Sequence, residues 1–275
     1  MTAGSEIYER FLALHARDGG LVMPNAWDGL SALLLADAGF EAIGTSSLAL
    51  AASLGRLDAR HAVSLQEHLA HAVLLGRLSG LPINGDFEDG YGRTGADVAA
   101  TVDVAVEAGL AGIGVEDTSG DPRNPIRPFD EAVDRIRHAV AAARGRIVLT
   151  GRCDNFVHGR PDLDDTVRRL TAFAEAGVDV LYAPFLPDLA AVRTIVAAVA
   201  PKPVNVVVSP MDKKLTVFEL QAVGVRRISL GGSLYRHVMA ALAQAAAALA
   251  SGDIASATET MSIQRMTDLL SPAQE

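Results

Sequence analysis

The stretch EAGLAGIGVED, residues 107–117, contains the unit from which most of this chain is built. An amphipathic segment rich in Ala and Val runs into Gly109, a residue that lets a helix end in the left-handed conformation. The run that follows alternates, so Gly112, Gly114 and Glu116 share one face and the branched apolar residues share the other. The pattern predicts a helix, a tight turn and a short strand that ends at a carboxylate.

Similar units recur along the chain. Strand-like runs cover residues 21–25, 41–46, 81–86, 111–117, 146–152, 178–184, 203–208 and 226–231. Helical patterns cover residues 27–38, 59–79, 95–108, 129–144, 162–176, 188–200, 215–223 and 233–250. Regular alternation of this kind indicates a parallel sheet wrapped by helices. Eight such units predict an α/β fold, a (β/α)8 TIM-type barrel, with a doubly wound open sheet as the alternative.

One helical pattern, near residues 253–270, remains after the eighth unit. We expect residues 1–250 to form a barrel catalytic domain and residues 251–275 to add an oligomerisation helix to that domain. A chain of 275 residues with 49 % hydrophobic residues needs no second core. The leftover helix has no barrel face waiting for it, so its apolar side chains predict contact with another subunit. They are Ile254, Ala257, Met261, Ile263, Met266, Leu269 and Leu270.

The composition excludes several classes of partner. A net charge of −9 provides no basic surface for nucleic acid or for anionic lipid. The single cysteine, Cys153, rules out an intramolecular disulfide, and no apolar run is long enough to span a membrane. The start of the chain lacks the pattern of a secretory signal. We therefore expect a soluble cytoplasmic protein that binds a small metabolite, and neither nucleic acid nor membrane.

Polar residues are concentrated where the predicted strands end, and in a TIM-type barrel these ends surround the active site. Asp86 and Glu88 follow the third strand, Glu116 ends the fourth and Arg152 ends the fifth. Carboxylates crowded into a pocket repel one another, so a cation or protons must neutralise them. Oxygen ligands favour Mg²⁺, with Mn²⁺ as the second choice. Asp58 is a further carboxylate available to the same site.

At these positions the sequence resembles the isocitrate lyase and phosphoenolpyruvate mutase superfamily, and within it the phosphoenolpyruvate mutase-like branch. The resemblance covers roughly residues 20–240 and rests on five motifs in combination. They are GTSSLALAASLGRLD (44–58), GDFEDGYG (85–92), GVED (114–117), TGRCDNF (150–156) and GVRRISLGGSLYR (224–236). Members bind a 2-oxo acid, or the enolate derived from it, on Mg²⁺ and break or form a C–C or P–C bond beside the carbonyl. The resemblance also implies helix exchange after the barrel, and hence dimers or tetramers.

The resemblance implies a role for each matching residue. Asp86 would ligate Mg²⁺ directly, and the other metal-site carboxylates, Asp58, Glu88 and Glu116, would hold metal-bound waters. Ser46 and Ser47, with the neighbouring Leu48, would cradle the substrate carboxylate. Arg152 would contact the substrate and stabilise the enolate oxygen. The other candidates are Asn205 and Asn124 for substrate binding, and Asp58, Glu116 and Tyr91 as catalytic groups beside Arg152.

The sequence also departs from the resembled family. Glu88 replaces the usual aspartate, and its longer arm should still reach a metal-bound water. The lyase members carry a KKCGH loop whose Cys is the base, but Glu116 is followed here by DTSGDPRNPIRP. Of the Lys-Thr-Asn motif in the gating loop of the mutases, only Asn124 matches. Alternation turns Cys153 away from the face of Arg152, which predicts a buried apolar role. His68 and His71 are expected to be solvated on an outer helix.

Together these features predict a Mg²⁺-dependent carbon-carbon lyase acting on a 2-oxo acid, a 2-hydroxy acid or a dicarboxylate. Substrates resembling oxaloacetate or a 2-alkylmalate fit best, because decarboxylation and retro-aldol cleavage can both use the metal and Arg152. Two alternatives remain open. One is a hydrolase or mutase that acts on the P–C bond of phosphonopyruvate, and the other is a weakly active protein that binds 2-oxo acids.

Overall fold

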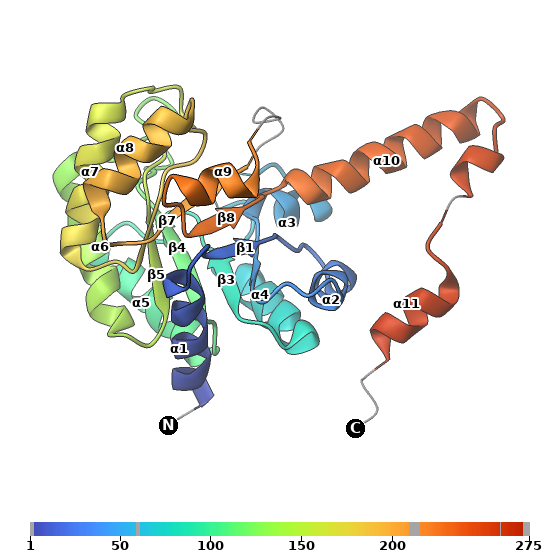
Figure 1. Ribbon diagram of the computed structural model, residues 1–275, viewed down its shortest axis with the longest axis horizontal. Coiled ribbons are helices and arrows are strands. Elements are labelled where there is room, and N and C mark those ends of the chain that lie inside the picture. Colours follow the sequence, from blue (N-terminus) through green and yellow to red (C-terminus); the bar gives the residue numbers. More distant parts are fainter. Residues whose placement is uncertain (1–2, 59–60, 209–214, 259, 272–275) are drawn as a thin grey trace.

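The computed structural model describes residues 3–58, 61–208, 215–258 and 260–271. Eight parallel strands form a barrel that is surrounded by helices, and a helical arm projects from one side of it (Figure 1). This architecture confirms the predicted (β/α)8 TIM-type barrel and excludes the open-sheet alternative. Within the described residues, no helix combines the length and the hydrophobicity needed to cross a membrane.

The strands are short and neighbour one another in the order β1-β8-β7-β6-β5-β4-β3-β2. They are β1 (Leu21–Met23), β2 (Ile43–Gly44), β3 (Ile83–Asp86), β4 (Gly112–Glu116), β5 (Val148–Arg152), β6 (Val180–Tyr182), β7 (Val204–Val207) and β8 (Arg227–Ser229). Each lies inside the range that the sequence predicts for it. The circle is completed by β1, which pairs with β8 and reaches β2 through a parallel bridge between Asn25 and Gly44.

The helices largely follow the predicted pattern. They are α1 (Ala3–Ala16), α2 (Gly29–Asp37), α3 (Ser47–Ser53), α4 (Leu65–Ser79), α5 (Gly95–Glu107), α6 (Phe129–Ala143), α7 (Leu163–Ala176), α8 (Leu189–Val199), α9 (Val217–Ala222) and α10 (Ser233–Ala250), followed by the 3₁₀ turn η1 (Ala255–Ala257) and α11 (Ile263–Leu270). Sequence analysis does not predict α1 or α3. The spacing of Ile7, Phe11 and Leu14 is a helical signal for α1, whereas α3 is a short helix capped by the Ser46 hydroxyl.

Local residue choices fix where several helices begin and end. Reciprocal capping boxes start α4, at Ser64 and Glu67, and α5, at Thr94 and Asp97. Gly177 ends α7 in the left-handed region with φ 111°, a conformation that costs glycine little. These caps turn the chain sharply back into the sheet, so each strand starts at the same end of the barrel.

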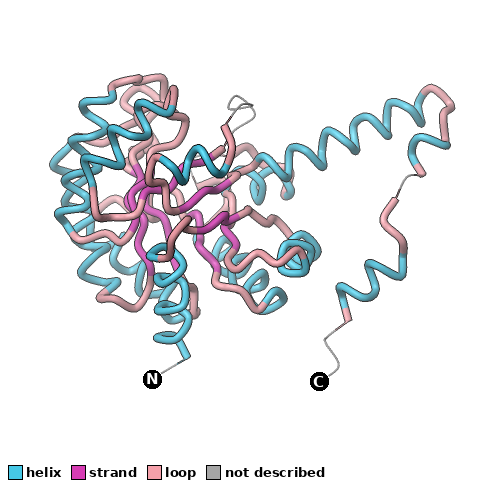
Figure 2. Tube along the Cα trace, in the orientation of Figure 1, coloured by secondary structure: helices cyan, strands magenta, loops and turns pink. Residues whose placement is uncertain are grey.

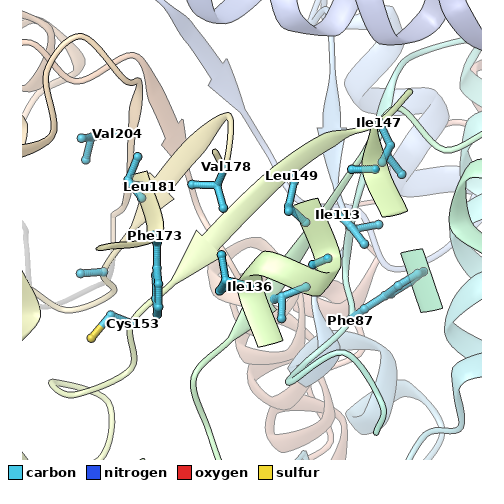
Figure 3. Packing of buried hydrophobic residues seen from close by; sticks show 14 of the residues in the cluster. Phe87, Ile113, Ile136, Ile147, Leu149, Cys153, Phe173, Val178, Leu181 and Val204 are labelled. Carbon is cyan, nitrogen blue, oxygen red and sulfur yellow. The ribbon is translucent and has the colours of Figure 1, made fainter. Parts of the chain in front are cut away.

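Most of the apolar core lies between the sheet and the surrounding helices. Ile113 and Leu149 point outward from β4 and β5, and they lie in one cluster with Ile136 of α6 and Phe173 of α7 (Figure 3). Outward positions of the strands are therefore apolar, which leaves the alternate, inward positions for polar groups.

A second, smaller cluster lies at the amino-terminal ends of the strands, where α1 packs. Phe11 and Leu14 of α1 contact the first residues of the strands, including Leu21 and Val148. His15 also belongs to this contact and is buried, with Nδ1 2.8 Å from the Phe11 carbonyl oxygen and Nε2 3.5 Å from Nη1 of Arg227. This arrangement suits a neutral imidazole, with the proton on Nδ1 and Nε2 as the acceptor. Burial, and then the charge of Arg227, lower the pKa of His15 to about 3.

A neutral His15 predicts how stability depends on pH. Below pH 6.5 the His15 side chain is protonated in the unfolded chain, whereas in the folded chain it stays neutral down to about pH 3. Between these two pH values acid therefore favours unfolding. Because of His15, the free energy of unfolding should fall by about 1.4 kcal/mol for each pH unit as the pH decreases between these two values. His15→Gln keeps a donor and an acceptor but does not titrate. Urea denaturation between pH 7 and pH 4.5 should give a shallower pH dependence for the variant, and parallel curves would contradict a neutral His15.

After β8 the chain leaves the barrel as an arm. Helix α10 has no buried residue and projects outward, and the chain then turns back through η1 to α11 beside α2 (Figure 2). Arg265 of α11 forms an ion pair with Asp37 of α2. The prediction of one helix near 253–270 is thus corrected, because Gly252 takes a positive φ of 89° and Ser262 caps a separate helix. Large apolar side chains remain exposed along the arm: Val238, Leu242, Leu249, Ile254, Met261, Ile263, Met266 and Leu270.

An exposed apolar arm predicts assembly. We expect the full chain to form a dimer or tetramer in which residues 233–275 contact a neighbouring barrel, because burial of five such side chains offers on the order of 8–12 kcal/mol before entropy. Deletion of residues 251–275 should give a smaller, aggregation-prone species in light scattering. If the truncated protein is well behaved and keeps the subunit number of the parent, the arm packs on its own barrel.

Candidate active site

A cavity of about 260 Å³ opens at the carboxyl-terminal ends of the strands. Eight of the residues that the sequence predicts for the site line it: Ser46, Ser47, Leu48, Asp58, Asp86, Glu116, Arg152 and Asn205. They come from the ends of different strands or from the segments that follow them. The strand register brings them together, because Asp86 pairs with Gly114, and Glu116 pairs with Arg152.

Asp86 is held by two hydrogen bonds from the end of β2. Its Oδ2 accepts the Ser47 backbone N–H at 2.9 Å, and its own N–H donates to Thr45 Oγ1 at 2.7 Å. Ser47 is the first residue of α3, so the Asp86 carboxylate also lies at a helix amino terminus, where negative charge is favoured. One oxygen of Asp86 is thereby fixed, and the other, Oδ1, faces Arg152 at 3.7 Å.

Arg152 links three carboxylates at the mouth of the cavity. It binds Asp154 with two donors, Nε at 2.6 Å and Nη2 at 2.8 Å, while Nη1 lies 2.7 Å from Glu116 Oε1. Its guanidinium carbon lies 5.1 Å from the centre of the Tyr182 ring. A planar guanidinium held by a bidentate carboxylate and an aromatic ring has little freedom to rotate. Nη1 is the part of this group that remains near both Glu116 and Asp86.

The charges in the cavity strongly perturb one another. Burial raises the pKa of Glu116 well above its usual value, although Arg152 opposes the shift. Burial, and then the charges of Asp86 and Glu88, raise the pKa of Asp58 to about 6. Burial alone would lower the pKa of Arg152, but the charges around it, chiefly Asp154 and Glu116, together hold that pKa above its usual value. Perturbation of several neighbouring groups is typical of a functional site, and these carboxylates carry more negative charge than Arg152 balances.

Two of the predicted residues, Glu88 and Tyr91, lie beside the cavity and do not line it. Both have positive φ angles, 46° for Glu88 and 55° for Tyr91, so the turn after β3 rotates their side chains away from the alternation of the strand. The Tyr91 hydroxyl oxygen lies 2.8 Å from the Val63 carbonyl oxygen and 3.1 Å from Glu88 Oε1, and its one hydrogen is available to these two acceptors. Burial, and then Glu88, raise the pKa of Tyr91. The geometry gives Tyr91 the role of holding Glu88, and does not support the predicted role as acid or base.

Asn124 is also not brought to the cavity. It lies in the loop between β4 and α6, in a turn closed by its N–H donating to the Asp121 carbonyl at 3.1 Å. The side-chain amide lies 3.4 Å from Asp121 Oδ2. The loop itself is pinned by an antiparallel bridge between Thr118 and Ile126. In this arrangement Asn124 does not contact a ligand in the cavity.

Several lining residues are not among those that sequence analysis names for the site, and four of these are Asn84, Thr150, Tyr182 and Arg227. Each occupies an inward position in the period-two pattern of its strand, two residues from another cavity residue or paired with one. Alternation predicts that Asn84 shares the face of Asp86 and that Thr150 shares the face of Arg152. It gives no such signal for Arg227, because an arginine within a strand is more often expected at the surface.

Three further predictions concern side chains outside the cavity. Cys153 is fully buried in the outer core near Phe173, as its position after Arg152 predicts (Figure 3). The expectation that His68 and His71 are solvated is wrong. His68 is 1 % exposed, and His71 Nε2 lies 2.9 Å from the Trp27 carbonyl oxygen. Both lie on the face of α4 that packs inward, because α4 contacts α2 and β3.

The donor set fits a divalent cation held by few direct ligands. Within the described residues, no three His, Cys, Asp or Glu side chains form a ready-made metal cage. Mg²⁺ does not need one, since it usually keeps several waters and takes one or two carboxylates from the protein. Asp86 offers one fixed and one open oxygen, and Asp58 and Glu116 border the same space. The excess negative charge of this group is what a cation would neutralise.

Comparison with known proteins identifies the family and supports the fold. The family model for phosphoenolpyruvate phosphomutase matches residues 11–250. A structure from Burkholderia cenocepacia J2315, described as a candidate lyase/mutase, is 38 % identical with a TM-score of 0.94, and the match covers 98 % of each chain.

Two curated enzymes match part of the chain. The 2-methylisocitrate lyase of Escherichia coli K12 is 33 % identical over 69 % of this chain and 66 % of the enzyme. The oxaloacetate decarboxylase of Paraburkholderia xenovorans LB400 is 34 % identical over 61 % of this chain and 58 % of the enzyme. The matched region thus spans less than two thirds of either enzyme.

Proposed function

Because the chain belongs to the phosphoenolpyruvate phosphomutase family, we propose that it is a Mg²⁺-dependent lyase that cleaves a C–C bond beside the carbonyl of a small 2-oxo acid. The observation that carries the proposal is the array of Asp86, Glu116 and Arg152 around one cavity. Breaking this bond leaves an electron pair on the carbon next to the carbonyl, and the pair is stabilised as an enolate. Groups that bind the enolate oxygen more strongly than the original carbonyl oxygen accelerate the step.

Each residue has a place in this reaction. Asp86 would hold the metal, which when bound supplies a Lewis acid for the substrate carbonyl. Ser46 and Ser47 border the cavity at the start of α3, and side-chain hydroxyl groups there would donate to the substrate carboxylate, since the Ser47 backbone N–H is already donated to Asp86 Oδ2. Arg152 presents Nη1 to the same space, and its contacts with Asp154 and Tyr182 keep it in position as charge develops.

The geometry favours decarboxylation of a substrate resembling oxaloacetate over retro-aldol cleavage of a 2-hydroxy acid. Retro-aldol cleavage needs a base to remove the hydroxyl proton, whereas loss of CO₂ from a 2-oxo dicarboxylate leaves the electron pair directly in the enolate. The KKCGH loop that carries the base of the lyase members is absent from the sequence, Cys153 is buried in the outer core, and Tyr91 is turned away from the cavity. Asp58 and Glu116 are the predicted acid–base groups that line it. Asp58 borders the cavity and is the group that we assign to protonate the enolate carbon.

Turnover should require Mg²⁺ and the Asp86 carboxylate. The test measures loss of oxaloacetate, 2-methylisocitrate and phosphonopyruvate with and without Mg²⁺ in the parent, Asp86→Ala and Glu88→Asp. We expect Mg²⁺-dependent decarboxylation of oxaloacetate by the parent, its loss in Asp86→Ala, and most of it retained in Glu88→Asp, because Glu88 does not line the cavity. Mg²⁺ affinity, measured by calorimetry, should fall only in Asp86→Ala. Equal Mg²⁺ affinity in Asp86→Ala and the parent would overturn the assignment of Asp86 as the metal ligand. Cleavage of phosphonopyruvate faster than that of the two carboxylic acid substrates would overturn the proposal that the protein is a C–C lyase.

Arg152 should affect the chemical step more than the fold. Arg152→Lys keeps the charge but loses the planar fork that binds Asp154 and Glu116 together, so kcat should fall on the order of a hundredfold. The melting temperature should change little, since a lysine still supplies a cation to the carboxylates. Loss of folding with normal specific activity in the folded fraction would mean that Arg152 is only an ion-pair partner.

A further inference from the structure

Arg227 differs from the other buried arginines. Within the described part of the chain, four arginines are buried: Arg127, Arg135, Arg169 and Arg227. The first three each lie near a carboxylate: Nη2 of Arg127 is 2.8 Å and Nη2 of Arg135 is 3.5 Å from Asp89 Oδ2, and Nη1 of Arg169 is 3.2 Å from Asp117 Oδ2. Arg227 lies near no carboxylate of the described residues, and it is the only one of the four that lines the cavity.

The partners of Arg227 are neutral. Nε donates to Asn205 Oδ1 at 2.9 Å, and Nη2 donates to Thr150 Oγ1 at 2.9 Å. Nη1 lies 3.4 Å from Asn84 Oδ1 and 3.5 Å from His15 Nε2. Burial lowers the pKa of Arg227 to about 10, so the guanidinium still carries its proton at neutral pH. A full positive charge therefore lies at the base of the cavity without a counter-ion from these residues.

These contacts also change what the neutral residues can offer. Asn84, Thr150 and Asn205 can each donate and accept hydrogen bonds, but Arg227 occupies an acceptor atom of each. The Asn84 amide hydrogens, the Thr150 hydroxyl hydrogen and one Asn205 amide hydrogen remain to donate, because the Asn205 amide already donates once to Ser229 Oγ at 3.0 Å. All four side chains line the cavity, and we call them the cavity floor. The floor thus combines a cation with groups whose remaining capacity is mainly to donate, which suits an oxyanion.

Space for a ligand group lies directly above the floor. Gly114 of β4 pairs with Asp86 on one side and with Thr150 on the other. A Cβ at Gly114 would meet no atom of the described chain within 4 Å, whereas a Cβ at Gly112, one layer below, would come within 2.7 Å of Asn84 Oδ1. The inward face of β4 is therefore open at the level of Asp86 and Thr150 and closed one layer below, at Gly112.

We propose that the cavity floor binds a second carboxylate of the substrate and thereby selects dicarboxylates over monocarboxylates of the same length. The inference rests on the proposed function, in which the first carboxylate lies at Ser46 and Ser47. It concerns substrate binding and selection and not acceleration of the step, because the second carboxylate of oxaloacetate is the group that leaves as CO₂. An uncompensated buried cation is costly, and a barrel interior filled by apolar residues would avoid that cost. A substrate carboxylate at the floor supplies the missing counter-ion, and the empty level beside Gly114 gives it a place.

The test compares two ligands that share a 2-hydroxy acid head and differ only at the far end. Malate has a second carboxylate where 2-hydroxybutyrate has a methyl group. Calorimetry of each with the Mg²⁺-loaded full chain should show malate binding about tenfold to a hundredfold more tightly, in line with one charge-assisted contact. Arg227→Gln should lower the affinity for malate by a similar factor and leave the affinity for 2-hydroxybutyrate almost unchanged.

Arg226→Gln is the matched control. Arg226 is the neighbouring residue, outside the cavity lining, and its guanidinium makes a 3.5 Å contact to the exposed Arg17 carbonyl. This variant should keep the ligand preference of the parent. An unchanged preference in a folded Arg227→Gln would show that Arg227 is structural and would overturn the proposal.

A second variant keeps the question answerable if Arg227→Gln does not fold. Thr150→Val retains the buried cation and the side-chain shape but removes one floor donor. This variant should reduce the preference for malate over 2-hydroxybutyrate severalfold. An undiminished preference would overturn the proposal that the cavity floor binds the second carboxylate. The experiment measures binding and not turnover, so it tests the cavity floor separately from the reaction. If the protein prefers malate but decarboxylates none of the substrates, the proposed reaction is refuted and the proposed carboxylate site at the floor is retained.

Discussion

The site depends on the parallel register of β3, β4 and β5. Pairing of Asp86 with Gly114 and of Glu116 with Arg152 leaves little freedom in where the side chains of Asp86, Glu116 and Arg152 point, because alternate residues of a strand face the barrel interior. Asp86 is then fixed further by Ser47 N–H and Thr45 Oγ1 at the end of β2. The active-site geometry is therefore a property of the sheet, and the helices act mainly by holding the sheet closed.

The two arginines of the cavity are held in opposite ways. Arg152 is surrounded by three carboxylates, those of Asp154, Glu116 and Asp86. These contacts fix its position, and its positive charge is neutralised within the protein. Arg227 is fixed by neutral acceptors, and its charge is not matched by a described carboxylate. The mouth of the cavity is consequently negative and its base positive. A small acid bound with a divalent cation at the mouth fits this gradient in charge.

The sequence predicts the sheet well and the turns poorly, for a physical reason. Period-two alternation and glycine caps specify all eight strands, and alternation also predicts that Arg152 and Glu116 face inward. Glu88 and Tyr91 follow β3 in a turn with positive φ, where alternation no longer applies, so Tyr91 turns to Val63 and Glu88. Asn124 lies in a loop whose shape depends on contacts made on folding. Arg227 is not predicted, because sequence alone does not show that a strand arginine points into a polar barrel interior.

The contact between His15 and Arg227 joins residues that are 212 positions apart in the sequence. Asn25 makes similar contacts, since its Oδ1 accepts the N–H groups of Leu230 and Gly231 across the seam between β1 and β8. Both contacts must wait until β8 is available, so during synthesis the first helix has no completed surface to cover. Long-range closure of this kind slows folding, because the entropy of a large loop is lost before its contacts form. The ribosome must therefore release nearly the whole chain before the barrel can shut, and until then α1 and the edge of β1 are surfaces for a chaperone to cover.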